Sequence, residues 1–168
     1  MPQPVTAYVG LGSNLEQPVG QITRAFDELA ALPDTRLMGC SPLYMSPPMG
    51  PQGQPDFVNA VAMLATTLTP QACMQALLAI EARHGRRRDG TRWGPRTLDL
   101  DLLLYGDTVL DTPGLVLPHP GMHERAFVLY PLADMAPELS VPGHGSVKAL
   151  LARCRDARIR RLEVETRE

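Results

Sequence analysis

The order in which apolar patterns and turn residues follow one another constrains the fold of this chain more than any single motif. Residues 6–14 predict a strand that leads into a glycine-rich turn, and apolar residues with helical spacing begin at Pro18. Residues 35–46 predict a second, interrupted strand. After a loop rich in proline and glycine, residues 57–68 alternate as a third strand does.

The second half of the pattern predicts another helix and another strand. Thr69 is a good N-cap, Pro70 suits the first helical position, and Gly85 suits the C-terminal cap of the helix between them. Residues 97–104 predict a fourth strand. The first six elements therefore have the order β-α-β-β-α-β, which is typical of a ferredoxin-like α+β sandwich with two helices on an antiparallel sheet. Two C-terminal helices are predicted at 122–135 and 146–154.

Length and composition predict one soluble domain over residues 1–168. Hydrophobic residues make up 44% of the chain and charged residues 20%, which is enough for a substantial core. Cys40, Cys73 and Cys154 are odd in number and far apart, as expected in a reducing compartment. We find no signal-peptide pattern and no apolar run near the roughly 20 residues of a membrane helix.

These observations predict a cytoplasmic protein with no membrane partner. The net charge of −2 also gives no reason to expect a nucleic-acid partner. We interpret the arginine-rich tail, residues 153–168, as a solvated surface segment.

The stretch RWGPRTLDLD, residues 92–101, places two aspartates on one face of a predicted strand. Side chains alternate along a strand, so Asp99 and Asp101 share the face opposite the leucines that flank them. Like charges on one face repel, and a positive group should compensate. Carboxylates about 6.6 Å apart along a strand can converge on Mg²⁺. The alternative is a solvated strand face whose aspartates pair with nearby arginines.

Arginines are concentrated just before this strand. Six of the fifteen arginines lie between residues 83 and 96, and the chain has a single lysine. Guanidinium groups bind phosphate oxygens through two hydrogen bonds and stay charged. Carboxylates that hold metal beside arginines that bind phosphate are typical of a phosphoryl-transfer site. A solvated basic loop is the alternative for Arg83, Arg87 and Arg92.

Two common nucleotide-binding patterns are absent. In GLGSNL, residues 10–15, Leu15 stands where the G-x-G-x-x-G fingerprint needs its third glycine, and no P-loop sequence occurs. ATP would therefore have to be held by arginines and metal. We interpret Gly10 and Gly12 as a tight turn with close backbone approach.

Asn59 lies between apolar neighbours on the third predicted strand. A buried Asn needs hydrogen-bond partners, either in the backbone or on the polar edge of a heteroaromatic ring. Phe57, two residues away on the same face, and Phe127 are candidates to stack on such a ring, with a position in the core as the alternative.

Four segments together resemble the 6-hydroxymethyl-7,8-dihydropterin pyrophosphokinases of folate biosynthesis: GLGSNL, SPLYMSPPMGPQGQPDFVNA, RWGPRTLDLDLLLYG and LPHPGMHERAFVLYPL. The resemblance extends from about residue 6 to residue 140, and GPRTLDLD is highly specific to that family. It implies a ferredoxin-like fold. It also implies transfer of the pyrophosphoryl group of ATP to the hydroxymethyl oxygen of the pterin, with release of AMP. We expect a monomer.

The resemblance implies roles for individual residues on the ATP side. Asp99 and Asp101 correspond to the ligands of two Mg²⁺ ions that lie against the ATP phosphates. The arginines of the family's mobile loop, which contact ATP, correspond to Arg86, Arg88 and Arg96, and its tryptophan, which packs inward, corresponds to Trp93. Residues near the ATP phosphates and ribose correspond to His119 and Arg125. The catalytic set implied is Arg86, Arg96, Asp99 and Asp101.

On the pterin side, Asn59 corresponds to the residue that contacts the edge of the pterin, and Phe57 and Phe127 correspond to the two rings that sandwich it. The pocket is lined largely through backbone by Ser46, Pro47, Pro48 and Gly50. The chain departs from the family at Pro120 and His123, where a tyrosine and a lysine are usual.

Two other classes of protein share parts of the pattern. Palm-type nucleotidyl transferases and cyclases also place metal-binding carboxylates on a ferredoxin-like sheet, but they do not require a pocket formed by Asn59, Phe57 and Phe127. An RNA-binding module of the same element order needs aromatics in an RNP-like sequence, which this chain lacks.

Overall fold

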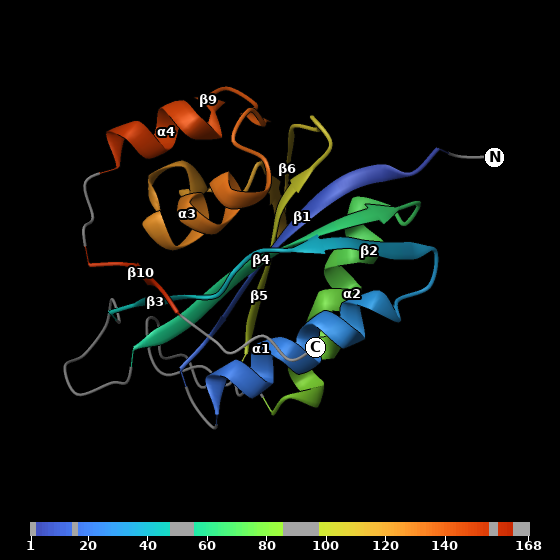
Figure 1. Ribbon diagram of the computed structural model, residues 1–168. Helices are drawn as coiled ribbons and strands as arrows, with labels where there is room; N and C mark the ends of the chain where they lie inside the picture. The colour runs from blue at the N-terminus through green and yellow to red at the C-terminus, as the bar shows by residue number, and fades with distance from the viewer. Residues whose placement is uncertain (1–2, 15–16, 48–55, 86–97, 155–157, 163–168) are drawn as a thin grey trace.

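A six-stranded antiparallel sheet forms the centre of the molecule, with helices on both faces (Figure 1). The computed structural model describes residues 3–14, 17–47, 56–85, 98–154 and 158–162. The strands of the sheet are β1 Val5–Ser13, β2 Thr35–Cys40, β3 Tyr44–Ser46, β4 Phe57–Thr66, β5 Asp99–Tyr105 and β10 Arg160–Arg161. Their order is β10–β3–β4–β1–β5, and β2 pairs with β4 next to β3, so β1 lies between β4 and β5.

Two helices cover each face of the sheet. The helices α1 Pro18–Ala30 and α2 Pro70–Arg83 pack on one face, and α3 Ala126–Met135 and α4 Val147–Arg153 pack on the other (Figure 1). The remaining short elements are β6 Leu110–Thr112, β7 Leu115–Leu117, η1 Met122–Glu124, β8 Ser140–Val141 and β9 Gly145–Ser146. None of the described helices is both long and apolar enough to cross a membrane.

The predicted order β-α-β-β-α-β is confirmed by these elements. The interrupted second strand appears as β2 and β3, which pair with the two ends of β4. The N-cap prediction for α2 is also confirmed, because the Thr69 side chain accepts a hydrogen bond from the amide of Ala72 at 3.1 Å.

For the C-terminal part of the chain, one prediction is wrong and another is incomplete. The single helix predicted over 122–135 is divided into η1 and α3, because Arg125 between them has an extended backbone with φ −103° and ψ 113°. The tail predicted to be solvated contains β10, which adds an edge strand to β3, and Ile159 before it is only 9% exposed.

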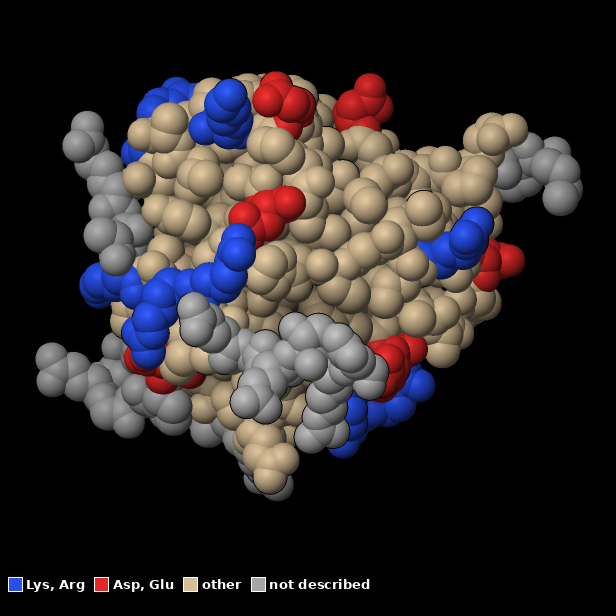
Figure 2. Space-filling view, viewed as in Figure 1, with Lys and Arg blue, Asp and Glu red and all other residues tan. Residues whose placement is uncertain are grey.

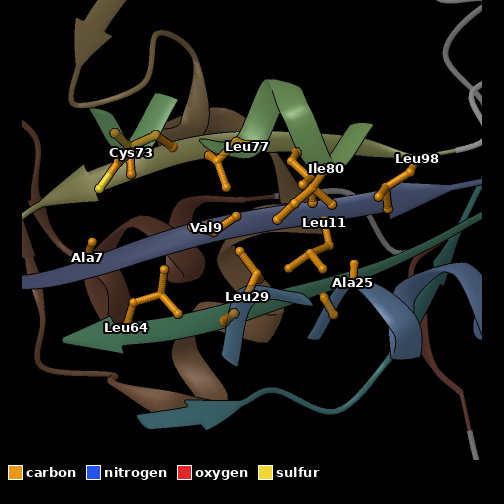
Figure 3. Close-up of a cluster of buried hydrophobic side chains, with 14 of the residues drawn as sticks. Ala7, Val9, Leu11, Ala25, Leu29, Leu64, Cys73, Leu77, Ile80 and Leu98 are labelled. Carbon is orange, nitrogen blue, oxygen red and sulfur yellow. The ribbon is translucent and has the colours of Figure 1, made fainter. Parts of the chain in front are cut away.

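The alternation of β1 separates two hydrophobic cores. Ala7, Val9 and Leu11 point into the larger core, which α1 and α2 close from outside (Figure 3). Tyr8 points to the opposite face and belongs to the core beneath α3 and α4. A strand that is buried on both faces is expected at the centre of a layered domain of this kind.

A β-bulge in β5 changes which face its residues occupy. Leu102 pairs with Val9 and Leu104 pairs with Tyr8, so Leu103 is the extra residue between them. Leu103 and Leu104 both pack in the core beneath α3 and α4. Before the bulge, Leu98, Leu100 and Leu102 point into the larger core, which confirms that the aspartates between them face the other way.

The outer edge of β5 is held by a buried carboxylate. β5 is the last of the described strands on its side of the sheet, so the amide of Leu100 has no partner there among those strands. Glu81 of α2 is 2% exposed, and its Oε2 accepts a hydrogen bond from this amide at 2.8 Å. The contact fixes the strand between Asp99 and Asp101.

We predict that Glu81→Ala lowers the free energy of unfolding by about 1–3 kcal/mol, because the amide of Leu100 would stay buried without its partner. Glu81→Gln keeps an acceptor oxygen and should lose less. Urea denaturation of both variants measures the difference, with Glu138→Ala as an exposed control. Equal stability of Glu81→Ala and the wild type would show that the contact contributes nothing.

Candidate active site

The sheet face beneath α3 and α4 carries two glycines of β1 next to each other, where other strand positions carry side chains. Gly10 and Gly12 lie on this face, and both are inside β1 rather than in a tight turn, which corrects the interpretation from sequence. A Cβ on Gly12 would lie 3.2 Å from Asn59 Nδ2, and one on Gly10 would lie 3.4 Å from the Leu103 methyl groups. The two glycines are buried and form a floor without side chains, the glycine floor, against which Asn59 and Leu103 pack.

Strand register aligns an amide and a carboxylate on opposite sides of this floor. Gly12 pairs with Asn59 of β4 on one side and with Asp99 of β5 on the other. Adjacent strands are about 4.8 Å apart, so the backbones of Asn59 and Asp99 are about 10 Å apart. Asp101 is paired with Gly10, one step further along the same face. The predicted pterin residue Asn59 and the predicted metal ligand Asp99 therefore share one row of the sheet, and Asp101 lies in the next row on the same face.

The carboxylates of Asp99 and Asp101 are half-buried. The Asp101 side chain is 34% exposed, and its Oδ1 lies 3.6 Å from Nε2 of His119. The backbone amide of His119 donates to the carbonyl oxygen of Leu103 at 2.9 Å, so the bulge in β5 also anchors the histidine. His119 Nδ1 is buried and has no hydrogen-bond partner among the described residues.

The donor set around the aspartates suits a hard cation with few protein ligands. No group of three or more His, Cys, Asp or Glu side chains that could hold a metal occurs within the described part of the chain. Mg²⁺ prefers one or two carboxylates together with water and phosphate oxygens, and Asp99 and Asp101 supply two carboxylates on one face. The arrangement fits Mg²⁺ better than Zn²⁺, which needs three or four closely placed protein ligands.

On the other side of the floor, the Asn59 side chain is buried and oriented. Asn59 is 4% exposed, and its Oδ1 accepts a hydrogen bond from the hydroxyl of Ser46 at 2.6 Å. Because Oδ1 accepts from Ser46, Nδ2 faces the floor at Gly12. The sequence resemblance assigned Ser46 to the pocket largely through its backbone. Its side-chain role depends on the pairing of β3 with β4, which no local motif indicates.

The two predicted aromatic residues come from different layers. Phe57 lies on the sheet two residues from Asn59, and the half-buried Phe127 lies in the first turn of α3. The guanidinium carbon of Arg125 lies 5.8 Å from the centre of the Phe127 ring, within the range of a cation–π contact. The structure therefore places Arg125 against a predicted pterin residue.

His123, which departs from the family pattern, stacks on His144 of the β8–β9 turn. The ring centroids are 3.8 Å apart and the planes differ by 11°. The predicted residues Pro48, Arg86, Arg88, Trp93 and Arg96 lie outside the described residues, as does Gly50, and their roles stay predictions.

Comparison with known proteins connects this geometry to one family. The family model described as 7,8-dihydro-6-hydroxymethylpterin-pyrophosphokinase (HPPK) matches residues 8–137. The 2-amino-4-hydroxy-6-hydroxymethyldihydropteridine pyrophosphokinase of Pseudomonas aeruginosa is 56% identical over 155 residues, which are 92% of this chain and 95% of the relative. The enzyme of the same name from Haemophilus influenzae is 43% identical over 158 residues, which are 94% of this chain and 98% of the relative.

Solved structures support the same fold. An HPPK-DHPS crystallised in complex with substrates superposes with a TM-score of 0.72 at 13% identity, over 97% of this chain and 47% of that one. The Plasmodium falciparum HPPK-DHPS with SDX-DHP gives a TM-score of 0.66 at 14% identity, over 89% of this chain and 43% of that one. Because the family model covers most of the sequence, the chain belongs to the 7,8-dihydro-6-hydroxymethylpterin-pyrophosphokinase family.

Proposed function

We propose that the glycine floor is where the two substrates of the pyrophosphokinase reaction meet. The pterin binds over Asn59, and the ATP phosphates lie over Asp99 and Asp101 with Mg²⁺. The pyrophosphoryl group then passes to the hydroxymethyl oxygen of 6-hydroxymethyl-7,8-dihydropterin, and AMP leaves. The observation that carries this proposal is the row Asn59–Gly12–Asp99 across three paired strands.

The pterin side is supported by the burial and orientation of the amide. Asn59 presents Nδ2 toward the floor because Ser46 occupies Oδ1, so the amide donates in a fixed direction. A buried donor of this kind favours a ligand with an acceptor at the matching position and penalises one without it. Phe57 and Phe127 supply the flat apolar surfaces that a heteroaromatic ring requires.

The phosphate side is supported by the charge and exposure of the aspartates. Asp99 and Asp101 are the residues that would hold Mg²⁺, and two ions are expected from the resemblance. Bound Mg²⁺ would offset charge on the phosphate oxygens of the transferred group. His119, 3.6 Å from Asp101, is placed to donate a hydrogen bond to a phosphate oxygen nearby.

Additional positive charge comes from residues assigned by the resemblance. Arg86, Arg88 and Arg96 would bind the ATP phosphates, and Trp93 would pack inward when their loop closes. In the reaction, the hydroxymethyl oxygen forms a bond to the β-phosphorus of ATP, and its proton is released to water. The bond from that phosphorus to the oxygen of the α-phosphate breaks, so the electron pair stays on AMP.

The proposed reaction is tested by the nucleotide product. Purified protein with ATP, Mg²⁺ and 6-hydroxymethyl-7,8-dihydropterin should produce AMP in a one-to-one ratio with pterin diphosphate. Chromatography of the nucleotides distinguishes the outcomes. Production of ADP, or hydrolysis of ATP that does not depend on the pterin, would refute pyrophosphoryl transfer.

We predict that Asp101→Asn and Asp99→Asn each raise the activation free energy by several kcal/mol, because an amide is a poor Mg²⁺ ligand. The turnover rate should fall more than about a hundredfold. Asp101→Asn should not melt earlier, since removal of one of two like charges relieves repulsion on the strand face and the contact of this carboxylate with His119, at 3.6 Å, is long. Rates at increasing Mg²⁺ and thermal melts measure both effects. Asp111→Asn, which removes an exposed charge from β6, is the control. If both site variants melt early but keep normal turnover while folded, the aspartates are not metal ligands.

We predict that Asn59→Ala weakens pterin binding by about 1–3 kcal/mol, or about 5- to 150-fold, because the polar edge of the pterin would lose its partner. ATP–Mg²⁺ binding should change less than about twofold, since the backbone of Asn59 is about 10 Å from that of Asp99. Calorimetric titration with each ligand separately measures the two affinities. Thr67→Ala, at an exposed position just after β4, is the matched control. Equal losses for both ligands would identify Asn59 as a structural residue only.

A further inference from the structure

A buried tyrosine connects the sheet to α3 beside the proposed pterin pocket. Tyr44 of β3 is 5% exposed, and its hydroxyl donates a hydrogen bond to Oδ2 of Asp134 in α3. Burial raises the pKa of the Tyr44 phenol, and the hydrogen bond to Asp134 acts in the same direction, so the hydroxyl stays a donor. The contact joins two elements that are far apart in the sequence.

The other oxygen of the same carboxylate binds the C-terminal strand. Nη2 of Arg161 in β10 lies 3.0 Å from Asp134 Oδ1, and its guanidinium carbon lies 5.8 Å from the centre of the Tyr44 ring. Figure 2 shows basic side chains next to an acidic one in the area where Figure 1 places β10. Asp134 therefore holds β3 and β10 at once.

Backbone pairing places β10 along the outer edge of β3. Arg161 pairs with Tyr44, Arg160 pairs with Met45, and the amide of Leu162 donates to the carbonyl oxygen of Leu43 at 2.8 Å. Ile159 packs with Tyr44 and Ala126 in a small cluster under the first turn of α3. The C-terminal segment thus covers a strand of only three residues that would otherwise be an open edge.

These contacts reach both walls of the proposed pocket. Tyr44 is paired with Asn59, and Ser46, two residues further on the same face, donates to the Asn59 amide. On the opposite wall, Asp134 lies seven residues after Phe127 in α3, about two turns along the same side of the helix. The Tyr44–Asp134 bond consequently connects the strand that orients Asn59 to the helix that carries Phe127.

We propose that Tyr44, Asp134 and Arg161 form a clasp that sets the separation between β3 and α3, and that these three positioning residues thereby determine the affinity for the pterin. The C-terminal strand becomes a functional part of the site rather than a surface tail. The inference depends on the proposed function, because the pocket between Asn59 and Phe127 is where we place the pterin.

The exposure of the Arg161–Asp134 ion pair distinguishes a role in positioning β3 and α3 from a role in folding stability alone. The side chains of Arg161 and Asp134 are 55% and 26% exposed. Exposed ion pairs contribute little to folding stability. Loss of Arg161 should therefore leave unfolding nearly unchanged while α3 and β3 lose their fixed spacing.

Two single substitutions test the clasp. Tyr44→Phe removes only the hydroxyl, and Arg161→Ala removes the guanidinium at a position exposed enough for the variant to fold. Tyr44→Phe should weaken binding of 6-hydroxymethyl-7,8-dihydropterin by about tenfold, the range expected for a hydrogen bond to a charged group. Arg161→Ala should weaken it by about two- to fivefold, the range expected for an exposed ion pair. ATP–Mg²⁺ affinity should stay within about twofold, and Arg161→Lys should recover part of the loss by restoring the charge.

The matched control is Arg160→Ala, which removes the same charge from the adjacent residue. The Arg160 side chain contacts only the Met45 sulfur, at 3.6 Å, among its side-chain hydrogen bonds in the described residues. This variant should bind the pterin as the wild type does. In the double variant Tyr44→Phe/Arg161→Ala, the losses should be less than additive because both substitutions break the same clasp.

Three outcomes would overturn the clasp: unchanged pterin affinity in both variants, equal weakening of both ligands, or a loss matched by Arg160→Ala. Asn59→Ala, titrated in parallel, separates this failure from failure of the proposed function. If Asn59→Ala loses pterin affinity selectively and the clasp variants do not, the pocket stands and the clasp is refuted. If the wild type does not bind the pterin, the proposed function itself is refuted.

Discussion

The pairing of β1 with both of its neighbours is the constraint on which the site depends. Its register with β4 places Asn59 beside Gly12, and its register with β5 places Asp99 on the other side of the same glycine. A slip of one residue in either pairing would exchange the faces of a whole strand. It would move either the amide or the carboxylates into the larger core. The packing of Val9 and Leu11 against α1 and α2 opposes such a slip. The larger core therefore keeps Asn59 and the aspartates aligned, although these residues lie on the opposite face of the sheet.

Much of the fold follows from local chemistry and could be predicted from the sequence. The alternation of Leu98, Asp99, Leu100 and Asp101 indicated both a strand and its two faces, since burial of leucine and exposure of aspartate give a strong period of two. Thr69 and Pro70 indicated the start of α2 for an equally local reason. The first amides of a helix have no partner within the helix, so a side chain that accepts a hydrogen bond, or a proline without an amide hydrogen, is favoured there. The family resemblance added the assignment of Asn59, which no periodicity could provide.

The parts that could not be predicted depend on contacts between distant segments. The bulge at Leu103 exists because two adjacent leucines pack beneath α3 and α4, and a run of three leucines gives no sign of where alternation is interrupted. Ser46 orients Asn59 only because β3 pairs with β4. The tail appeared to be solvated because its arginines dominate its composition. Its pairing with β3 uses backbone groups, which composition does not show.

The absence of side chains at Gly10 and Gly12 has a consequence for inhibitors that would bind at the proposed site, and for resistance to them. A molecule that lies on the floor contacts peptide groups, and a substitution can change these groups only by adding a side chain. At Gly12 even a methyl group would lie 3.2 Å from the Asn59 amide. A variant that excludes an inhibitor from this surface would therefore also displace the group proposed to bind the substrate. For a compound no larger than the pterin at this site, few substitutions should therefore weaken inhibitor binding without also weakening pterin binding.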